Sequence, residues 1–313
     1  MAVSSFGSVY LMVVAWPGFK MHLIHSNQIA TSAELVRELL RSQYLDIANE
    51  PIAEQPMHGT DSDTYRVGDH HAVRLPIIDW AFGKQEHIRP WLPWINVRIS
   101  TPVPIPVYYG APDCGYPHTW TIYPWLPGET LDFGVESPDI ARDIAGFLLE
   151  VRAMPIEGAP SAGRSPHALD GDVRKCLDQL TDKDGREELI KVWDEMMQSP
   201  AWDGEERVWM HGDVAPGNLL FIEGTFAGAI DWTEIGVGDP ASDLQVAWNF
   251  FGPKGREAFR EAMRVDDAVW DRARARAFAQ AAFQLPYYRQ SLPALAEQAQ
   301  YVFAQIFNET QQS

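Results

Sequence analysis

The sequence predicts an α+β protein with two unequal lobes, a small strand-rich N-lobe over residues 21–128 and a larger, mainly helical C-lobe over residues 129–313. Before Gly128, short runs of β-branched and aromatic residues alternate with turn residues, which is typical of β-strands. After Ser137, apolar residues recur at the spacing of amphipathic helices. A chain of 313 residues is long enough to bury two substantial cores.

Local signals predict each element of the N-lobe. Ser32 is a suitable N-cap for a helix whose apolar residues, Leu35 and Leu39 among them, share one face. Prolines at 102, 104 and 106 indicate extended chain, because proline cannot continue a helix or donate to a sheet. The predicted N-lobe elements are a helix over 32–40, a strand–turn–strand over 58–68, a strand over 71–75, a helix over 80–91 and a strand over 118–123.

The C-lobe is predicted to consist of helices around one β-hairpin. Two short apolar runs, 219–222 and 226–230, flank Glu223 and Gly224, which is the pattern of a tight hairpin turn. Residues 157–164 are rich in Gly, Ala, Pro and Ser and indicate a loop. The predicted helices cover 139–154, 172–198, 241–251, 254–264, 267–285 and 292–307.

Composition narrows the classes of function. The 25 Lys and Arg residues against 43 Asp and Glu residues give a formal net charge of −18, which argues against nucleic-acid binding. An acidic cleft concentrates cations, so the charge is compatible with a cationic small molecule; for the net charge alone, a role in solubility is the favoured explanation. The two cysteines, Cys114 and Cys176, match no metal or redox spacing, and a reduced cytoplasmic protein is the simplest interpretation.

Residues 1–20 differ from the rest of the chain. The apolar run over 9–16 is too short to cross a bilayer and lacks the flanking pattern of a secretory signal. We therefore expect no membrane segment here. Met21 is an alternative start, which would make residues 1–20 an N-terminal extension.

The stretch from Trp209 to Trp232 carries the strongest chemical signal. Asp213 and Asn218 have the D-x-x-x-x-N spacing of a kinase catalytic loop, in which the Asp meets an attacking hydroxyl and the Asn holds a metal ion. The predicted hairpin would return Asp231 to the side of Asn218. Amide and carboxylate oxygens suit Mg²⁺, so the sequence predicts a magnesium site at these two residues.

Several motifs resemble those of the aminoglycoside and macrolide phosphotransferase family. They are the string H-G-D-x-x-x-x-N, the hairpin and the I-D-W after it, residues 236–241 (GVGDPA) and Asp243. The resemblance implies the fold of the protein kinases. It implies that Asp213 is the base for the acceptor hydroxyl and that His211 supports the loop. Asp239 and Asp243 would buttress the loop or, as an alternative, contact the substrate.

The same resemblance assigns residues of the N-lobe to the nucleotide. The turn that covers the phosphates would comprise Gly59, Thr60, Asp61 and Ser62, although a single glycine makes this signature weak. Arg74 stands at the position of the phosphate-binding lysine; it keeps the charge but has a different reach. An arginine at the end of a strand on the surface is the alternative.

The remaining assignments rest on position within the predicted fold. Glu86 would pair with Arg74 across the predicted helix, although a solvated glutamate on a helix face explains it as well. Main-chain atoms near Tyr123, Trp125 and Leu126 would hold adenine at the hinge between the lobes. Glu234 would face an amino sugar or remain a solvated loop carboxylate.

The expected function is an ATP- or GTP-dependent, Mg²⁺-dependent O-phosphotransferase that acts on a small, hydroxylated, cationic molecule. Aminoglycoside-like or macrolide-like antibiotics are the first candidates, which would confer antibiotic resistance; choline-, fructosamine- and homoserine-like metabolites are the others. We expect no nucleic acid, membrane or protein partner. The alternative is a nucleotide-binding pseudokinase, which Arg74 favours and the intact set of Asp213, Asn218 and Asp231 disfavours.

Overall fold

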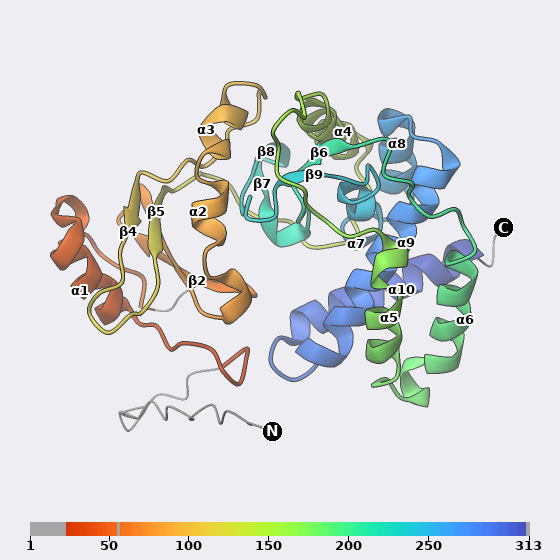
Figure 1. The fold of residues 1–313 in the computed structure, drawn as a ribbon, viewed down its shortest axis with the longest axis horizontal. Helices are drawn as coiled ribbons and strands as arrows, with labels where there is room; N and C mark the ends of the chain where they lie inside the picture. The colour runs from red at the N-terminus through yellow and green to blue at the C-terminus, as the bar shows by residue number, and fades with distance from the viewer. Residues whose placement is uncertain (1–22, 55–56, 311–313) are drawn as a thin grey trace, which may run out of the picture.

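The computed structural model describes residues 23–54 and 57–310, so the predicted extension and Met21 lie outside it. The N-lobe contains one antiparallel five-stranded sheet in the order β1-β2-β3-β5-β4 (Figure 1). No helix among the described residues combines the length and apolarity needed to span a bilayer. The strands are β1 Met57–His58, β2 Ser62–Val67, β3 His71–Pro76, β4 Tyr108–Gly110 and β5 Trp120–Pro124.

Helix α1 (Ala33–Gln43) and the inner face of the sheet form the core of the N-lobe (Figure 1). The predicted cap is confirmed, because Ser32 Oγ accepts a hydrogen bond from the N–H of Leu35 at 3.1 Å. Val36 and Leu39 are fully buried against sheet residues such as Trp120. Each buried aliphatic side chain of this kind contributes about 1.5–3 kcal/mol, so the helix is held mainly by packing.

The segment between β3 and β4 differs from the single predicted helix over 80–91. It forms three short helices, η2 (Asp79–Ala81), α2 (Lys84–Ile88) and α3 (Trp91–Asn96). Gly83 has φ of +83° and Pro90 cannot donate to a helix, so the chain breaks at both residues. Trp91 and Trp94 then pack on Trp209 of the C-lobe, with ring centroids 5.3 and 5.4 Å apart. This segment therefore connects the two lobes.

The C-lobe is mainly helical, as the sequence predicts, and it contains two small sheets. The hairpin is confirmed as β7 (Leu219–Ile222) and β8 (Thr225–Ala229), whereas the second sheet, β6 (Val208–Met210) with β9 (Gly236–Gly238), was not predicted. Figure 1 places α9 and α10 beside each other below the hairpin region. The helices are α4 Pro138–Arg152, α5 Pro166–Leu177, α6 Arg186–Met196, α7 Val246–Asn249, α8 Pro253–Met263, α9 Asp267–Tyr288 and α10 Pro293–Thr310, with short 3₁₀ turns η1 Leu45–Ile47, η3 Asp182–Asp184, η4 Pro216–Asn218 and η5 Asp243–Gln245.

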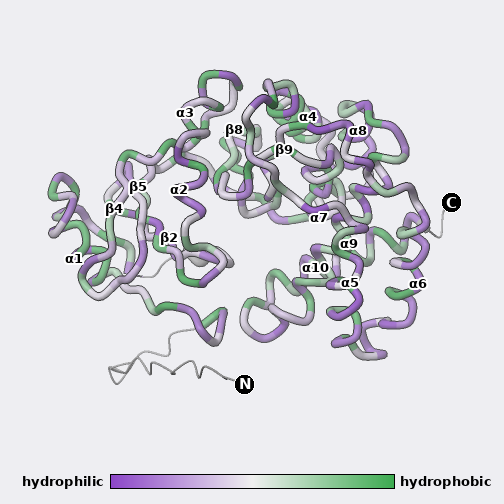
Figure 2. Tube along the Cα trace, viewed as in Figure 1, coloured by the Kyte–Doolittle hydropathy of each residue, from purple (hydrophilic) through white to green (hydrophobic). Residues whose placement is uncertain are grey.

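Two predicted C-lobe helices were too long. The predicted helix over 172–198 is divided into α5 and α6, because Gly185 adopts φ of +72° between them. The predicted helix over 241–251 is a 3₁₀ turn, η5, followed by the four-residue α7. Figure 2 shows hydrophobic and hydrophilic residues alternating along α5 and α6, which cover the outside of the lobe.

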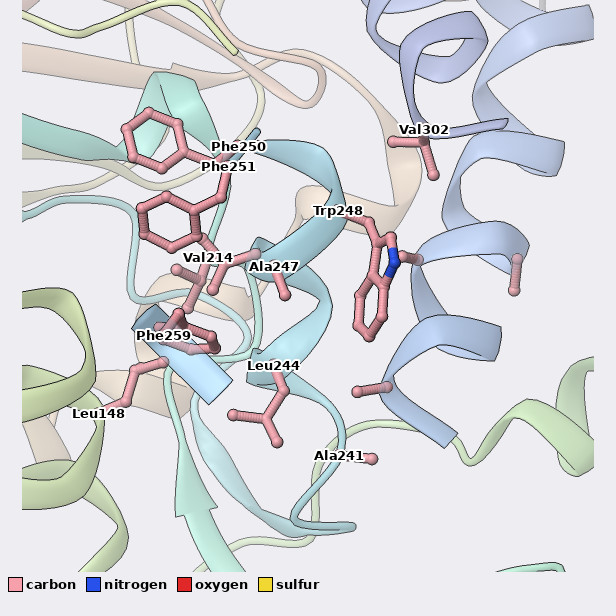
Figure 3. Close-up of a cluster of buried hydrophobic side chains, with 14 of the residues drawn as sticks. Leu148, Val214, Ala241, Leu244, Ala247, Trp248, Phe250, Phe251, Phe259 and Val302 are labelled. Atoms are coloured by element: carbon pink, nitrogen blue, oxygen red, sulfur yellow. The ribbon is translucent and has the colours of Figure 1, made fainter. Parts of the chain in front are cut away.

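The core of the C-lobe forms around α9, whose many buried alanines let neighbouring helices approach closely. Leu244 and Trp248 of the η5–α7 segment belong to this core, and Figure 3 shows Val214 beside Ala247, with Trp248 pointing away from it. A buried ion pair between Arg272 of α9 and Asp239, with Nε and Oδ2 3.1 Å apart, ties the end of β9 to the same helix. The catalytic loop thus rests on a packed helical base.

Candidate active site

The β7–β8 hairpin brings Asp231 to the side of Asn218, as predicted. Glu223 and Gly224 both adopt positive φ, at 50° and 76°, which matches the twist of a two-residue hairpin. The N–H of Ile230 donates to the carbonyl oxygen of Asn218 at 2.9 Å. Asp231 itself has φ of 60°, an unusual conformation for a residue with a side chain. Such local strain is common at functional sites.

The buried His211 side chain forms hydrogen bonds to two segments of the site, one at Ile230 and one at Asp213. Its Nε2 donates to the carbonyl oxygen of Ile230 at 3.1 Å, and its Nδ1 accepts from the N–H of Asp213 at 3.3 Å. Burial lowers the pKa of His211 to about 4, because a charged imidazole would lose its hydration. The ring is therefore neutral, and its contacts match the supporting role proposed for it.

Asp243 also holds the loop that contains His211 and Gly212. Its two carboxylate oxygens accept the backbone N–H groups of His211 at 2.7 Å and Gly212 at 2.8 Å. Burial raises the pKa of Asp243 to about 6, and the two N–H donors offset only part of that increase. Gly212 has φ of +90°, and a Cβ there would lie 2.3 Å from the carbonyl oxygen of Glu234, so this position requires glycine.

Asp213 faces a cavity and is positioned by Asn218. The side-chain amide of Asn218 donates to both the carbonyl oxygen and Oδ2 of Asp213, each at 2.9 Å. Burial and the neighbouring charge of Asp231 raise the pKa of Asp213 to about 7. A carboxyl with a pKa near neutrality is well matched to accepting a proton from a hydroxyl.

Arg74 reaches Asp231 from strand β3. Its Nη1 and Nη2 donate to the two oxygens of Asp231, each at 2.7 Å, and the hydroxyl of Thr233 donates to Oδ1 of Asp231 at 2.7 Å. Burial by itself would raise the pKa of Asp231, but the charge and hydrogen bonds of Arg74 outweigh it and hold the pKa at about 2. With 8% of its surface exposed, Arg74 is not a surface residue.

Three more charged residues, Asp61, Lys84 and Glu234, are linked to Arg74 by further ion pairs. Arg74 Nη2 also lies 2.9 Å from Oδ1 of Asp61, and Nζ of Lys84 lies 3.4 Å from the other oxygen of Asp61. Lys84 also pairs with Glu234 at 2.5 Å. Charges of alternating sign therefore run Glu234–Lys84–Asp61–Arg74–Asp231, a set that we call the ion chain. No sequence signal pointed to Lys84, because the break at Gly83 was not predicted.

The predicted pairing of Arg74 with Glu86 is absent from the described residues. Glu86 is exposed on α2 and accepts a hydrogen bond from the hydroxyl of Thr119. The buried positions of this short helix belong to Gln85 and Ile88, and Gln85 bonds the hydroxyl of Tyr123 instead. Because α2 presents Gln85 inward, the carboxylates that meet the guanidinium come from Asp61 and Asp231.

Two cavities meet at Asn218 and Asp231. The first, which we call the inter-lobe cavity, has a volume of about 400 Å³ and is lined by Arg74 from the N-lobe. The second, the catalytic-loop cavity, has a volume of about 670 Å³ and is lined by Asp213. Predicted nucleotide residues Gly59, Ser62, Arg74, Tyr123, Trp125 and Leu126 line the inter-lobe cavity, and Thr60 lines the catalytic-loop cavity. Four residues line both cavities: Gly59, Gly217, Asn218 and Asp231.

The donor set at the junction suits a hard cation. Asn218 offers an amide oxygen and Asp231 an ionised carboxylate, and Mg²⁺ typically takes one or two protein ligands together with phosphate oxygens and water. Within the part of the chain that the structure describes, no cluster of three His, Cys, Asp or Glu side chains could hold a metal by itself. A magnesium ion bound by these two residues would complete its coordination with phosphate oxygens or water.

The fold and the site together define a two-lobed protein in which a cavity between the lobes opens onto the partly buried Asp231. A model of the phosphotransferase enzyme family (APH) matches residues 53–278. The chain therefore belongs to the phosphotransferase enzyme family.

Individual relatives agree with this assignment. An aminoglycoside 3'-phosphotransferase of Streptomyces fradiae is 29% identical over 198 residues, which are 56% of this chain and 72% of that protein. Three further curated relatives match over 52%, 61% and 53% of their own lengths.

Solved structures confirm the predicted kinase-like fold. The GDP and kanamycin complex of an aminoglycoside 2"-phosphotransferase has a TM-score of 0.70 at 18% identity, and the match covers 87% of this chain and 98% of that chain. The macrolide 2'-phosphotransferase MphH from Brachybacterium faecium has a TM-score of 0.57 at 18% identity, covering 86% and 96%. At these identities the likeness concerns the fold alone.

Proposed function

We propose that the chain transfers the γ-phosphate of ATP or GTP to a hydroxyl group of a small molecule. One observation carries the proposal: the two cavities share Asn218 and Asp231, with Arg74 on one side and Asp213 on the other. A phosphate donor in the inter-lobe cavity would then reach an acceptor in the catalytic-loop cavity at the shared residues. GDP and ADP complexes of similar folds support the nucleotide assignment.

Each catalytic residue then has a defined task. Asp213 orients the acceptor hydroxyl and takes its proton, and the amide of Asn218 keeps the carboxyl in place. Arg74 holds the non-transferred phosphates, where its planar guanidinium can form two parallel hydrogen bonds. A Mg²⁺ ion held by Asn218 and Asp231 would neutralise phosphate charge.

Main-chain atoms of the linker after β5 would hold the purine base. Tyr123, Trp125 and Leu126 line the inter-lobe cavity at the point where the chain passes between the lobes. His211, Asp239 and Asp243 hold the catalytic loop and do not act on the substrate themselves. The acceptor class remains that of the family, an aminoglycoside-like, macrolide-like or related hydroxylated molecule, and phosphorylation of such an antibiotic would confer resistance. We place the reaction in the cytoplasm, where nucleoside triphosphates are abundant.

A second candidate is a pseudokinase that binds nucleotide without transfer. The bidentate pairing of Arg74 with Asp231 favours it, because this pairing occupies the carboxylate that a metal would need. The near-neutral pKa of Asp213 argues for transfer, since a binding module has no need for a proton acceptor.

The decisive experiment compares wild type with Asp213→Asn. Phosphate transfer from γ-labelled ATP and GTP is measured with kanamycin, a macrolide and neutral glycosides as acceptors, alongside nucleotide affinity. Asp213→Asn should lower kcat by about 10²–10⁴-fold and leave nucleotide affinity unchanged, because the amide keeps the shape but takes no proton.

The matched control is Asp139→Asn, which changes an exposed carboxylate at the start of α4 and should behave as wild type. Nucleotide binding with no transfer to any acceptor in the wild-type protein would favour the pseudokinase. Undiminished transfer by Asp213→Asn would remove Asp213 from the role of base.

A further inference from the structure

Two aromatic side chains are unusually accessible. Among the described Phe, Trp and Tyr residues, only Trp80 and Tyr287 are exposed, with 49% and 52% of their surface in solvent. Trp80 belongs to η2 of the N-lobe, and Tyr287 lies near the end of α9 in the C-lobe. Both line the catalytic-loop cavity. Single exposed apolar residues are ordinary, but two aromatic rings from different lobes at one cavity indicate a binding surface.

A buried histidine holds these two rings, which we call the aromatic pair. His25 is 2% exposed and precedes α1; Figure 1 shows this segment beside the turn between α9 and α10. Nε2 of His25 donates to the carbonyl oxygen of Thr60 at 2.5 Å, and Nδ1 accepts from the hydroxyl of Tyr287 at 2.8 Å. The imidazole meets the ring of Trp80 edge to face, with centroids 4.9 Å apart. Because both rings are restrained, a ligand that stacks on them loses little of its binding energy to ordering side chains.

The face of α9 that continues from the aromatic pair is polar but uncharged. Gln280 and Gln284 lie one helical turn apart, and Tyr287 follows on the next turn of the same face. Both glutamines line the cavity and are partly exposed. Their amides can donate and accept hydrogen bonds, which suits hydroxyl groups. Asp213 lines the same cavity. Aromatic faces, amides and the proposed base therefore share one space.

We infer that Trp80 and Tyr287 form a stacking subsite for a hydroxylated ring of the acceptor. The inference rests on the proposed phosphotransfer and narrows its acceptor to a ring-bearing molecule. The C–H face of a sugar ring is apolar and its rim carries hydroxyl groups, so it fits aromatic faces that lie beside glutamine amides. A ring held there leaves another hydroxyl of the same molecule to approach Asp213.

An acceptor without a ring does not suit this cavity. The volume of about 670 Å³ lies in the range of pockets that enclose drug-sized ligands. A choline- or homoserine-like molecule would leave most of this space unfilled and would not cover both members of the aromatic pair. Choline is the sharpest comparison, because aromatic rings also attract quaternary ammonium groups.

The first test compares acceptors with and without rings on the full-length protein with ATP and Mg²⁺. The probes are kanamycin, erythromycin and phenyl β-D-glucopyranoside, against choline and homoserine. Transfer from γ-labelled ATP gives kcat/KM, and saturation-transfer NMR detects binding through the C–H protons of each probe. We expect the best ring-bearing probe to exceed both ring-less ones by about tenfold or more, the equivalent of one lost stacking contact. Better turnover of choline or homoserine, or no binding of any ring-bearing probe, would overturn the inference.

The second test removes one aromatic face at a time. Trp80→Ala and Tyr287→Ala should each raise the KM for the best ring-bearing acceptor about three- to tenfold. The kcat should stay close to wild type, because neither ring is assigned to the reacting atoms. The KM for nucleotide should not change, because neither residue lines the inter-lobe cavity. The midpoint of thermal unfolding should also stay close to wild type, since both side chains are half exposed.

Conservative variants separate stacking from structural support. Trp80→Phe and Tyr287→Phe keep an aromatic face and should retain most of the acceptor affinity. Leu45→Ala is the matched control, because Leu45 is an exposed apolar residue that lines neither cavity. If Tyr287→Phe raises the KM for the acceptor as much as Tyr287→Ala does, the hydroxyl and not the ring carries the effect, and the stacking subsite is wrong.

The outcomes also separate this inference from the proposed function. An unchanged KM for the acceptor in both alanine variants would overturn the subsite and leave phosphotransfer intact. Failure of the wild-type protein to bind nucleotide would instead contradict the proposed function.

Discussion

The two cavities that meet at Asp231 differ in the charged group that each adds to it: Arg74 lines the inter-lobe cavity and Asp213 lines the catalytic-loop cavity. On one side the ion chain spans the lobes, and every member of it has an oppositely charged neighbour within 3.4 Å. On the other side the wall consists of amides and apolar groups, apart from the catalytic carboxylates. Buried charges are tolerated when they are paired, so the ion chain shows where the protein handles charge. The phosphate donor of the proposed function suits the first cavity, because Arg74 lines it.

Asp231 belongs to both cavities, and its removal should have the largest effect on this contrast. Asp231→Ala removes a metal ligand and leaves Arg74 with one carboxylate partner. We expect kcat/KM to fall by about 10²–10³-fold, comparable to the loss of a charge-stabilising group in other active sites. Asn218→Ala should cost less, because it removes no charge. Steady-state kinetics over a range of Mg²⁺ concentrations measures both, and an unchanged Mg²⁺ dependence in both variants would place the metal elsewhere.

Substitution of Arg74 tests the inter-lobe cavity alone, because Arg74 does not line the catalytic-loop cavity. Arg74→Ala should raise the KM for nucleotide and lower kcat, with a combined loss of about 10–100-fold, because it removes both a phosphate ligand and its alignment. Arg74→Lys should restore activity only in part, since lysine keeps the charge but loses the paired donors. Nucleotide affinity with and without Mg²⁺ gives the readout. An Arg74→Ala protein with wild-type affinity would contradict the phosphate role and favour the pseudokinase.

Substitution of His211 tests how this residue stabilises the loop between the two cavities. The quantity measured is the pH dependence of the free energy of unfolding. The pKa of His211 is about 4 in the folded protein and about 6.5 in an unfolded chain, so its contribution to stability is present above pH 6.5 and is lost as the pH falls through 4. His211→Asn should therefore be less stable at pH 7, and its difference from wild type should shrink toward pH 4. Asp243, with its raised pKa, acts in the opposite direction in both proteins and cancels in the difference. Denaturant unfolding at several pH values measures this, and a constant difference would contradict the assignment.

Glu234 should give the smallest effect, because its side chain is 48% exposed. Glu234→Gln weakens the end of the ion chain at Lys84, and exposed pairs contribute about 1 kcal/mol or less. We expect a small loss of stability and an unchanged KM for neutral acceptors. A large rise in the KM for an amino-sugar acceptor would instead show that Glu234 contacts the substrate and that the acceptor is cationic.

The helix over 80–91 shows where local pattern failed. Its apolar residues suggested one element, but Gly83 and Pro90 divide it into three. The predicted partner Glu86 thereby turned outward, and Gln85 took the inner position. Sequence spacing cannot give the direction of a side chain when the axis of its helix changes. The ion chain, which includes Lys84, was hidden for the same reason.

The sequence by itself determined the β7–β8 hairpin, the spacing of Asp213 and Asn218 and the division into a strand-rich and a helical lobe. These features depend on neighbouring residues, because turn propensity and periodicity act over a few positions. The tertiary structure decided which groups meet across the lobes. Arg74 and Asp231 are 157 residues apart in the chain, and Lys84 and Glu234 are 150 apart. The catalytic-loop cavity likewise emerges only when segments far apart in the chain close around one space, because burial is a property of the packed chain.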